Sequence, residues 1–155
     1  MTETLVLDAS VAIKWVVQEE GTEAALRLRS LDLVAPELIL AECANILWKK
    51  AERAELTREE ALLAARLVER SGIEFVSLFG LSERTVALAI ELGHPAYDCA
   101  YLALALARRM VTADRRLLAR VGQRGSPELA NLCLASVIFR REPAANVRSR
   151  PFSLR

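Results

Sequence analysis

Four acidic side chains occupy positions in this sequence where a water-exposed carboxylate is not expected. Asp8 follows the apolar run 5–7, and Asp114 comes shortly after the run 110–112. Glu42 lies in an apolar helix-forming segment, with leucine and isoleucine three and four residues away on its own face. Asp98 begins another such segment, and its face continues with tyrosine, leucine and alanine. These placements predict that all four acids point inward or toward the edge of a sheet.

The chemistry that suits such a set is metal-dependent hydrolysis of a phosphodiester. Four buried carboxylates that meet repel one another, and most of them cannot stay ionised without compensation. A divalent cation supplies it, and Mg²⁺ or Mn²⁺ prefers hard oxygen ligands. One such ion lowers the pKa of an attacking water, and a second ion about 4 Å away stabilises the leaving oxygen. This chemistry needs no Ser/His/Asp or Cys/His apparatus, in agreement with a single histidine in the chain.

Each acid also has a purely structural explanation. Asp98 and Asp114 stand near expected helix starts, where aspartate is favoured as a cap, and Asp8 suits a turn after a strand. Glu42 is harder to explain, because an unpaired carboxylate on an apolar stripe is costly, although a buried arginine partner would account for it. The joint placement of the four acids favours the metal site.

Two other classes of function stay open at this point. Asp8 after a strand also suits phosphoryl transfer through an aspartyl-phosphate, although that chemistry usually has a second acid two residues later, where this chain has Ser10. A non-catalytic module that binds RNA or a protein partner would keep the fold and bind no metal at the acids.

The elements that position the acids alternate, which predicts an α/β fold with a central, mainly parallel sheet. Short apolar runs predict strands at 5–7, 33–35, 73–78, 110–112 and 131–139. Periodicity and capping residues predict helices at 11–18, 22–30, 36–53, 57–71, 81–92, 97–109 and 115–121. We expect Ser10 to cap the first helix, Pro36 to lie in the first turn of the third, and Thr57 with Glu60 to form a capping box.

Length and composition predict one folded domain that is neither exported nor membrane-bound. The chain has 155 residues, 53% of them hydrophobic and 26% charged, which is typical of a single globular domain. No apolar run approaches the roughly 20 residues of a membrane span, and the N-terminus lacks signal-peptide features. Three scattered cysteines and one histidine exclude a zinc-type Cys/His cluster and suit reduced thiols in the cytoplasm.

The net charge of +1 conceals two basic segments. Six arginines oppose one aspartate across 108–124, and five arginines oppose one glutamate across 140–155. Such segments attract phosphates, face an acidic partner or form a solvated surface. The second segment has no apolar periodicity, so we predict a domain over 1–139 and an Arg-rich tail over 140–155.

Four sequence segments carry more specific information. They are LVLDASVAIKW (5–15), PELILAECAN (36–45), YDCAYLALA (97–105) and VTADRRL (111–117). Together, and in this order, they resemble the PIN-domain ribonucleases, most of all the VapC-type toxins of toxin–antitoxin pairs. The resemblance covers roughly 5–134. It implies a three-layer α/β/α fold and a Mg²⁺- or Mn²⁺-dependent endoribonuclease with Asp8, Glu42, Asp98 and Asp114 as its acids.

The resemblance also suggests supporting residues. Ser10 and Thr112 match hydroxyl positions that help to place metal or water, and Asn45 matches a position that can hydrogen-bond into the acid cluster. Some relatives carry a further acid where this chain has Arg115 and Arg116, which leaves the number of metal ions open. We expect possible RNA contacts from these two arginines and from Lys14, for which a solvated surface position is the alternative.

Family resemblance further implies a homodimer and a cognate antitoxin that holds the enzyme inactive. Exposed apolar residues such as Trp15 would suit that partner, whereas we expect Trp48 to pack in the core. We also expect Tyr97 to pack against the sheet edge rather than to stack on a base. His94 lies in the loop before Asp98, and that position alone does not support a role as a general acid.

Overall fold

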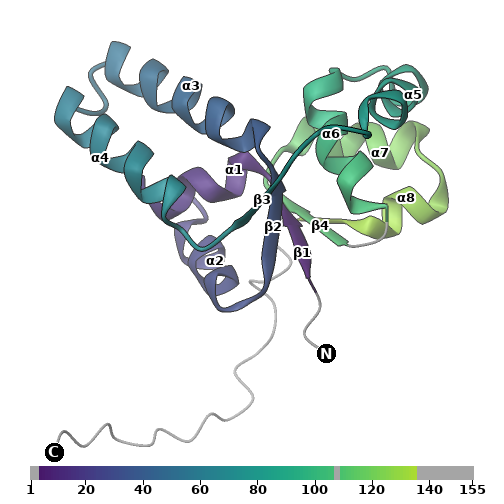
Figure 1. The fold of residues 1–155 in the computed structure, drawn as a ribbon, viewed down its shortest axis with the longest axis horizontal. Coiled ribbons are helices and arrows are strands. Elements are labelled where there is room, and N and C mark those ends of the chain that lie inside the picture. The colour runs from purple at the N-terminus through teal and green to yellow at the C-terminus, as the bar shows by residue number, and fades with distance from the viewer. Residues whose placement is uncertain (1–3, 107–108, 136–155) are drawn as a thin grey trace, which may run out of the picture.

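The computed structural model describes residues 4–106 and 109–135, and a five-stranded sheet forms its centre (Figure 1). The strand order is β3-β2-β1-β4-β5, and all four neighbouring pairs are parallel. The strands are β1 (Leu5–Leu7), β2 (Leu33–Pro36), β3 (Glu74–Val76), β4 (Arg109–Thr112) and β5 (Cys133–Ala135). The expected α/β fold with a parallel sheet is confirmed.

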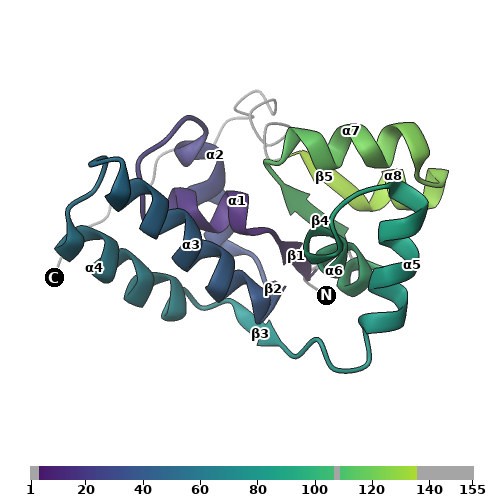
Figure 2. The ribbon, with the colours of Figure 1, turned by 90° about the horizontal axis from the view of Figure 1, so that it is seen from above.

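Helices lie on both sides of this sheet and complete a three-layer α/β/α arrangement. In Figures 1 and 2, α3 and α4 run side by side as one group, α5, α6 and α7 form another, and the strands lie between them. None of the helices in the described part of the chain is long and apolar enough to cross a membrane. The helices are α1 (Ala9–Ala12), η1 (Ile13–Trp15), α2 (Thr22–Arg27), η2 (Leu28–Ser30), α3 (Leu38–Glu52), α4 (Arg58–Glu69), α5 (Ser82–Leu92), α6 (Ala96–Ala105), α7 (Arg115–Arg124) and α8 (Pro127–Leu132).

The two central strands are buried along their whole length, which explains their uninterrupted apolar sequences. All residues of β1 and β2 are buried, as expected for strands of a parallel sheet covered on both faces. Helix α6 is buried from Cys99 to Ala105 and packs against β1, β2 and β4. Asp98, in the first turn of α6, therefore lies at the boundary between this core and the solvent.

The first helix is shorter than the predicted 11–18, and Ser10 does not cap it. Helix α1 passes after four residues into the 3₁₀ turn η1, and Asp8 occupies the N-cap position. The Ser10 hydroxyl, inside α1, donates to the Asp8 carboxylate. The capping prediction is wrong because this hydroxyl binds the Asp8 carboxylate and does not cap the start of the helix.

Pro36 ends β2 and does not belong to the first turn of α3, contrary to the prediction. It lies opposite Val76 in the parallel ladder. The N–H of the next residue, Glu37, donates to the Val76 carbonyl at 2.9 Å. Because that N–H maintains the pairing, the missing N–H of proline does not end the strand before Pro36.

The predicted last strand, 131–139, begins later than expected. Its first two residues end α8, whose N-cap Ser126 accepts a hydrogen bond from the Leu129 N–H at 3.2 Å. Strand β5 follows as Cys133–Ala135. The rest of the predicted strand and the predicted tail lie outside the described residues, so the domain boundary stays a prediction.

Other helix boundaries differ by a few residues or agree. Helix α6 ends at Ala105, and Arg109, expected at its C-terminus, begins β4 instead. The capping box of α4 is confirmed: Thr57 and Glu60 exchange hydrogen bonds of 2.7 and 3.2 Å. Gly93 ends α5 with a positive φ of 58°, a conformation that glycine adopts without steric cost.

Two aromatic side chains lie outside the core, contrary to expectation. Trp48 is 57% exposed and Tyr97 is 56% exposed. The buried stripe of α3 runs through Ile39, Cys43 and Leu47, and the residue after Leu47 is rotated away from it by the helical period. Tyr97 likewise precedes the buried face of α6, so both rings are available to solvent or to a partner.

Candidate metal centre

Two of the four acids come together because their strands are neighbours. Strands β1 and β4 pair in parallel with Leu7 opposite Val111, so Asp8 and Asp114 follow the carboxyl ends of adjacent strands. The Asp8 N–H extends this pairing by donating to the Val111 carbonyl at 3.2 Å. The two carboxylates thus lie at the edge where parallel α/β sheets bind ligands.

Asp8 is only 7% exposed, and two hydroxyl groups orient its carboxylate. Its Oδ2 accepts hydrogen bonds from Ser10 and from Thr112, the latter at 2.8 Å. The two hydroxyl oxygens accept in turn from the N–H groups of Ala113 and Asp114, each at 2.9 Å. Burial raises the pKa of Asp8, although both hydroxyls act in the opposite direction.

Asp98 and Asp114 form a closer group with His94. His94 Nε2 lies 2.8 Å from Asp98 Oδ2, and one potential ligand atom from each of the three side chains lies within 4.8 Å of the others. Asp114 also caps α7, because its Oδ1 accepts from the N–H groups of Arg116 at 2.7 Å and Leu117 at 3.2 Å. This cap uses one carboxylate oxygen, so capping and ligand binding are compatible at Asp114.

Glu42 approaches the group from α3 and is held by a buried tyrosine. The Tyr101 hydroxyl, on α6, donates to Glu42 Oε2. Burial raises the pKa of Glu42 to about 7, the negative charges of Asp8 and Asp98 add to this, and the tyrosine hydrogen bond opposes it. Among the described residues, the charged groups that shift this pKa are the carboxylates of Asp8 and Asp98, and no arginine acts on it.

The four carboxylates influence one another electrostatically. Burial is the largest cause of the raised pKa at Asp8, Glu42 and Asp98, and neighbouring carboxylates raise each pKa further. At Asp98, His94 acts in the opposite direction. Buried carboxylates that raise one another's pKa stay ionised together only when a nearby positive charge compensates their negative charges. The arrangement is therefore chemically suited to hold a cation.

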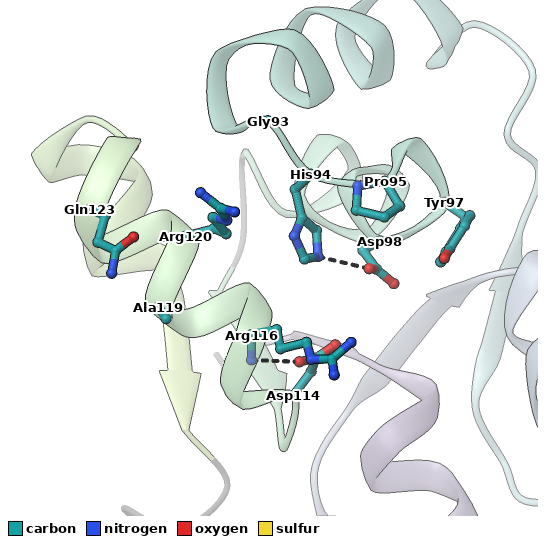
Figure 3. Close-up of a pocket in the computed structure, with 10 residues that line it drawn as sticks. All are labelled: Gly93, His94, Pro95, Tyr97, Asp98, Asp114, Arg116, Ala119, Arg120 and Gln123. Carbon is teal, nitrogen blue, oxygen red and sulfur yellow. Dashed lines mark hydrogen bonds and ion pairs between the residues drawn. The ribbon is translucent and has the colours of Figure 1, made fainter.

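His94, Asp98 and Asp114 open into a cavity of about 670 Å³ (Figure 3), whereas Asp8 and Glu42 do not line it. His94 and Asp98 line one side of it, and Asp114 and the arginines Arg116 and Arg120 line the side formed by α7 (Figure 3). Candidate ligands and positively charged side chains thus share one opening, which is an arrangement suited to a phosphate-bearing substrate.

The remaining residues singled out in the sequence lie away from this cavity lining. Lys14 forms an ion pair with Glu19 at 3.3 Å and donates to the Glu20 carbonyl at 2.9 Å, so it is not a freely solvated lysine. Arg115 is exposed. Asn45 is exposed one turn after Glu42, and within the described ranges no hydrogen bond connects it to the acids.

Two side chains join the group without having been assigned to it from the sequence. The loop position of His94 does not by itself support a general-acid role, yet the α5–α6 loop places its imidazole against Asp98. Tyr101 was regarded as part of an apolar face. Its position three residues after Asp98, on the same face of the helix, is a signal that could have placed its hydroxyl near the acids.

Comparisons with known proteins identify the family of this chain. The family model described as PIN domain matches residues 5–123. Ribonuclease VapC3 of Pyrobaculum aerophilum is 35% identical over 127 residues, which cover 73% of this chain and 91% of that protein. The resemblance found from the sequence segments is thereby confirmed.

Solved structures show the same fold. The crystal structure of PAE2754 from Pyrobaculum aerophilum matches with a TM-score of 0.64 and 23% identity, covering 90% of this chain and 88% of the other. A toxin–antitoxin complex from Klebsiella pneumoniae matches with a TM-score of 0.55 and 16% identity, covering 85% of this chain and 97% of the other. On the family match and the identity to VapC3, this chain belongs to the PIN domain family.

Proposed function

We propose that this protein is a metal-dependent endoribonuclease of the VapC type and that the acid group is its active site. The observation that carries the proposal is that Asp98 and Asp114 lie close together with His94, while Asp8 and Glu42 interact electrostatically with these acids and, like Asp98, have a raised pKa. The PIN domain match and the identity to a protein named as a ribonuclease support the same activity.

Mg²⁺ or Mn²⁺ fits the donor set of this site. The available atoms are mainly carboxylate oxygens, which are hard ligands, and their mutual repulsion favours a cation. Asp8, Asp98 and Asp114 would hold the metal directly, and Glu42 would bind it or orient water. When bound, the cation lowers the pKa of a water molecule and stabilises negative charge on the phosphodiester.

The protein's own residues hold the acids and the water in place. Ser10 and Thr112 donate to Asp8 Oδ2 and fix the direction of this carboxylate toward the metal. Tyr101 fixes Glu42 through Oε2, so Oε1 accepts a hydrogen bond from the attacking water in this proposal. No covalent intermediate with the protein forms, because water attacks the phosphodiester directly.

RNA would enter through the cavity of Figure 3. Arg116 and Arg120 line it beside Asp114 and would neutralise backbone phosphates. Tyr97, half-exposed at the same cavity, is suited to stacking on a base of single-stranded RNA. Specificity for RNA would thus arise at the rim, whereas the acids perform the hydrolysis.

A cognate antitoxin, a homodimeric state and a cytoplasmic location belong to the same proposal. The name VapC3 and the toxin–antitoxin complex that shares the fold support the antitoxin. Exposed apolar side chains on neighbouring helices α3 and α4 offer such a partner a surface: Trp48, Leu62, Leu63 and Leu67.

The proposal is tested by RNA cleavage with matched variants. Wild-type protein, Asp8→Asn and Glu91→Gln are incubated with a pool of single-stranded and structured RNA in Mg²⁺, Mn²⁺ or EDTA. We expect metal-dependent cuts from the wild type and from Glu91→Gln, which changes an exposed acid on α5. Asp8→Asn should lose at least about 100-fold of the rate, because it removes one metal-binding charge.

The alternatives give different results in the same preparations. Metal-dependent cleavage that persists in Asp8→Asn would overturn the assignment of the site. A wild type that neither cleaves RNA nor binds metal would indicate the non-catalytic binding module. Covalent phosphate on Asp8 after incubation with a small phosphodonor would indicate the aspartyl-phosphate chemistry.

A further inference from the structure

The proposed metal site contains one side chain that an oxygen-only site does not need. His94 follows Gly93 in the loop between α5 and α6. Its side chain is only 8% exposed, and Figure 3 shows the imidazole turned toward Asp98.

The contact between His94 and Asp98 is close, with the length of an ion pair. Nε2 and Oδ2 are 2.8 Å apart, His94 acts to lower the pKa of Asp98, and the buried Nε2 has no further hydrogen-bond partner among the described residues. In octahedral coordination with metal–ligand distances of about 2.1 Å, adjacent ligand atoms lie roughly 3 Å apart. The two atoms are therefore spaced like neighbouring ligands of one ion, and Asp114 offers a third within 4.8 Å.

We propose that His94 Nε2 is a metal ligand together with Asp98 and Asp114, and that it makes the site prefer Mn²⁺ to Mg²⁺. The inference rests on the proposed function, because it concerns the same metal site. Mg²⁺ is bound almost entirely by oxygen and retains water. Imidazole suits transition metals, whose affinities for nitrogen and oxygen ligands rise from Mn²⁺ onward along the series. A single nitrogen among carboxylates thus favours Mn²⁺ while Mg²⁺ can still bind.

The test uses the fact that His94 is the only histidine in the chain. Full-length, tag-free protein is loaded with Mn²⁺, and pulsed electron paramagnetic resonance is used to detect coupling to an imidazole nitrogen. Calorimetry gives the affinities for Mn²⁺ and Mg²⁺. We expect imidazole coupling in the wild type and an affinity for Mn²⁺ at least about tenfold higher than for Mg²⁺.

Three variants distinguish a ligand from a structural side chain. His94→Gln should lose the imidazole coupling and about 10- to 100-fold of the Mn²⁺ affinity, with a smaller change for Mg²⁺. Asp98→Asn should lose affinity for both ions. Gln123→Ala alters the same cavity wall without removing an acid or the imidazole, and it should retain wild-type binding.

The outcomes separate this inference from the proposed function. Bound Mn²⁺ without imidazole coupling, or unchanged affinities in His94→Gln, would overturn the role of His94 and leave the nuclease proposal intact. A wild type that binds no Mn²⁺ would overturn both. Because the coupling is measured on the wild type, the test holds even if a variant fails to fold.

Discussion

At the scale of single residues, Thr112 connects two of the acids through one hydroxyl group. The residue is fully buried. Its Oγ1 donates to Asp8 Oδ2 at 2.8 Å and accepts from the Asp114 N–H at 2.9 Å. Removing the hydroxyl would leave two polar groups without these partners, and a buried unsatisfied group costs about 1–3 kcal/mol.

Thr112→Val, which retains the shape of the side chain, should therefore lower the free energy of unfolding by about 2 kcal/mol. It should also weaken Mn²⁺ binding, because Asp8 loses one of the bonds that orient it. Urea unfolding and calorimetry measure the two effects, and Thr112→Ser should restore most of both. A valine variant as stable as the wild type would contradict the linking role of the hydroxyl.

Sequence patterns could identify the acids but not all of their contacts. Asp8, Glu42, Asp98 and Asp114 are visible because each interrupts or ends an apolar pattern. Tyr101 and Glu42 are 59 residues apart in the sequence. The periodicity of a helix or strand does not predict which side chains meet across such a separation. His94 escaped assignment because a loop has no repeating geometry from which a side-chain direction follows.

At the scale of elements, Glu19 connects the segment after η1 to helix α3, which carries Glu42. Glu19 Oε1 lies 2.6 Å from Lys50 on α3, and its Oε2 lies 3.3 Å from Lys14 on η1. Burial acts to raise the pKa of Glu19, but the two lysines outweigh it and lower the pKa below its ordinary value of 4.5. The ionised form is thus stabilised by folding.

Glu19→Gln should destabilise the protein by on the order of 1 kcal/mol at pH 7. Because the folded-state pKa is lowered, this contribution is present above pH 4.5 and is lost as the pH falls through the lowered pKa. Urea midpoints of the wild type and the variant should therefore converge in acid. Glu20→Gln, which changes an exposed neighbour, is the control; a constant difference across the pH range would argue against the ion pairs as the cause.

Element types followed from apolar runs and caps, whereas some boundaries did not. The buried strands β1 and β2 were recognisable because full burial requires uninterrupted apolar sequence. Pro36 was misplaced because a proline fits a helix start as well as a strand end. The start of the last strand was misplaced because the apolar residues on either side of Asn131 do not mark where the short helix α8 ends and the strand begins.

At the scale of the whole molecule, the order of the strands explains why two of the candidate metal ligands lie at the same edge of the sheet. β1 and β4 are neighbours although a hundred residues separate them, so Asp8 and Asp114 meet only in the folded protein. The α/β class follows from alternating elements, but the strand order does not. The family resemblance implies the three α/β/α layers, and the order β3-β2-β1-β4-β5 comes from the structure.

Charge distribution over the molecule leads to a prediction about RNA binding. The net charge is only +1, yet Arg116 and Arg120 line the cavity, whereas the exposed Arg115 does not. If backbone phosphates enter the cavity, Arg116→Ala and Arg120→Ala should each weaken binding, and each should reduce the slope of log affinity against log salt by about 0.7. Arg115→Ala should change both quantities much less.

Fluorescence anisotropy across a salt series measures both quantities, with a labelled single-stranded RNA and every variant in the Asp8→Asn background, so that the RNA stays uncut. The comparison isolates position from charge, because all three variants remove one positive charge from the same helix. Equal effects at the three positions would mean that RNA responds to the overall charge of α7, and the proposed entry through the cavity would then be wrong.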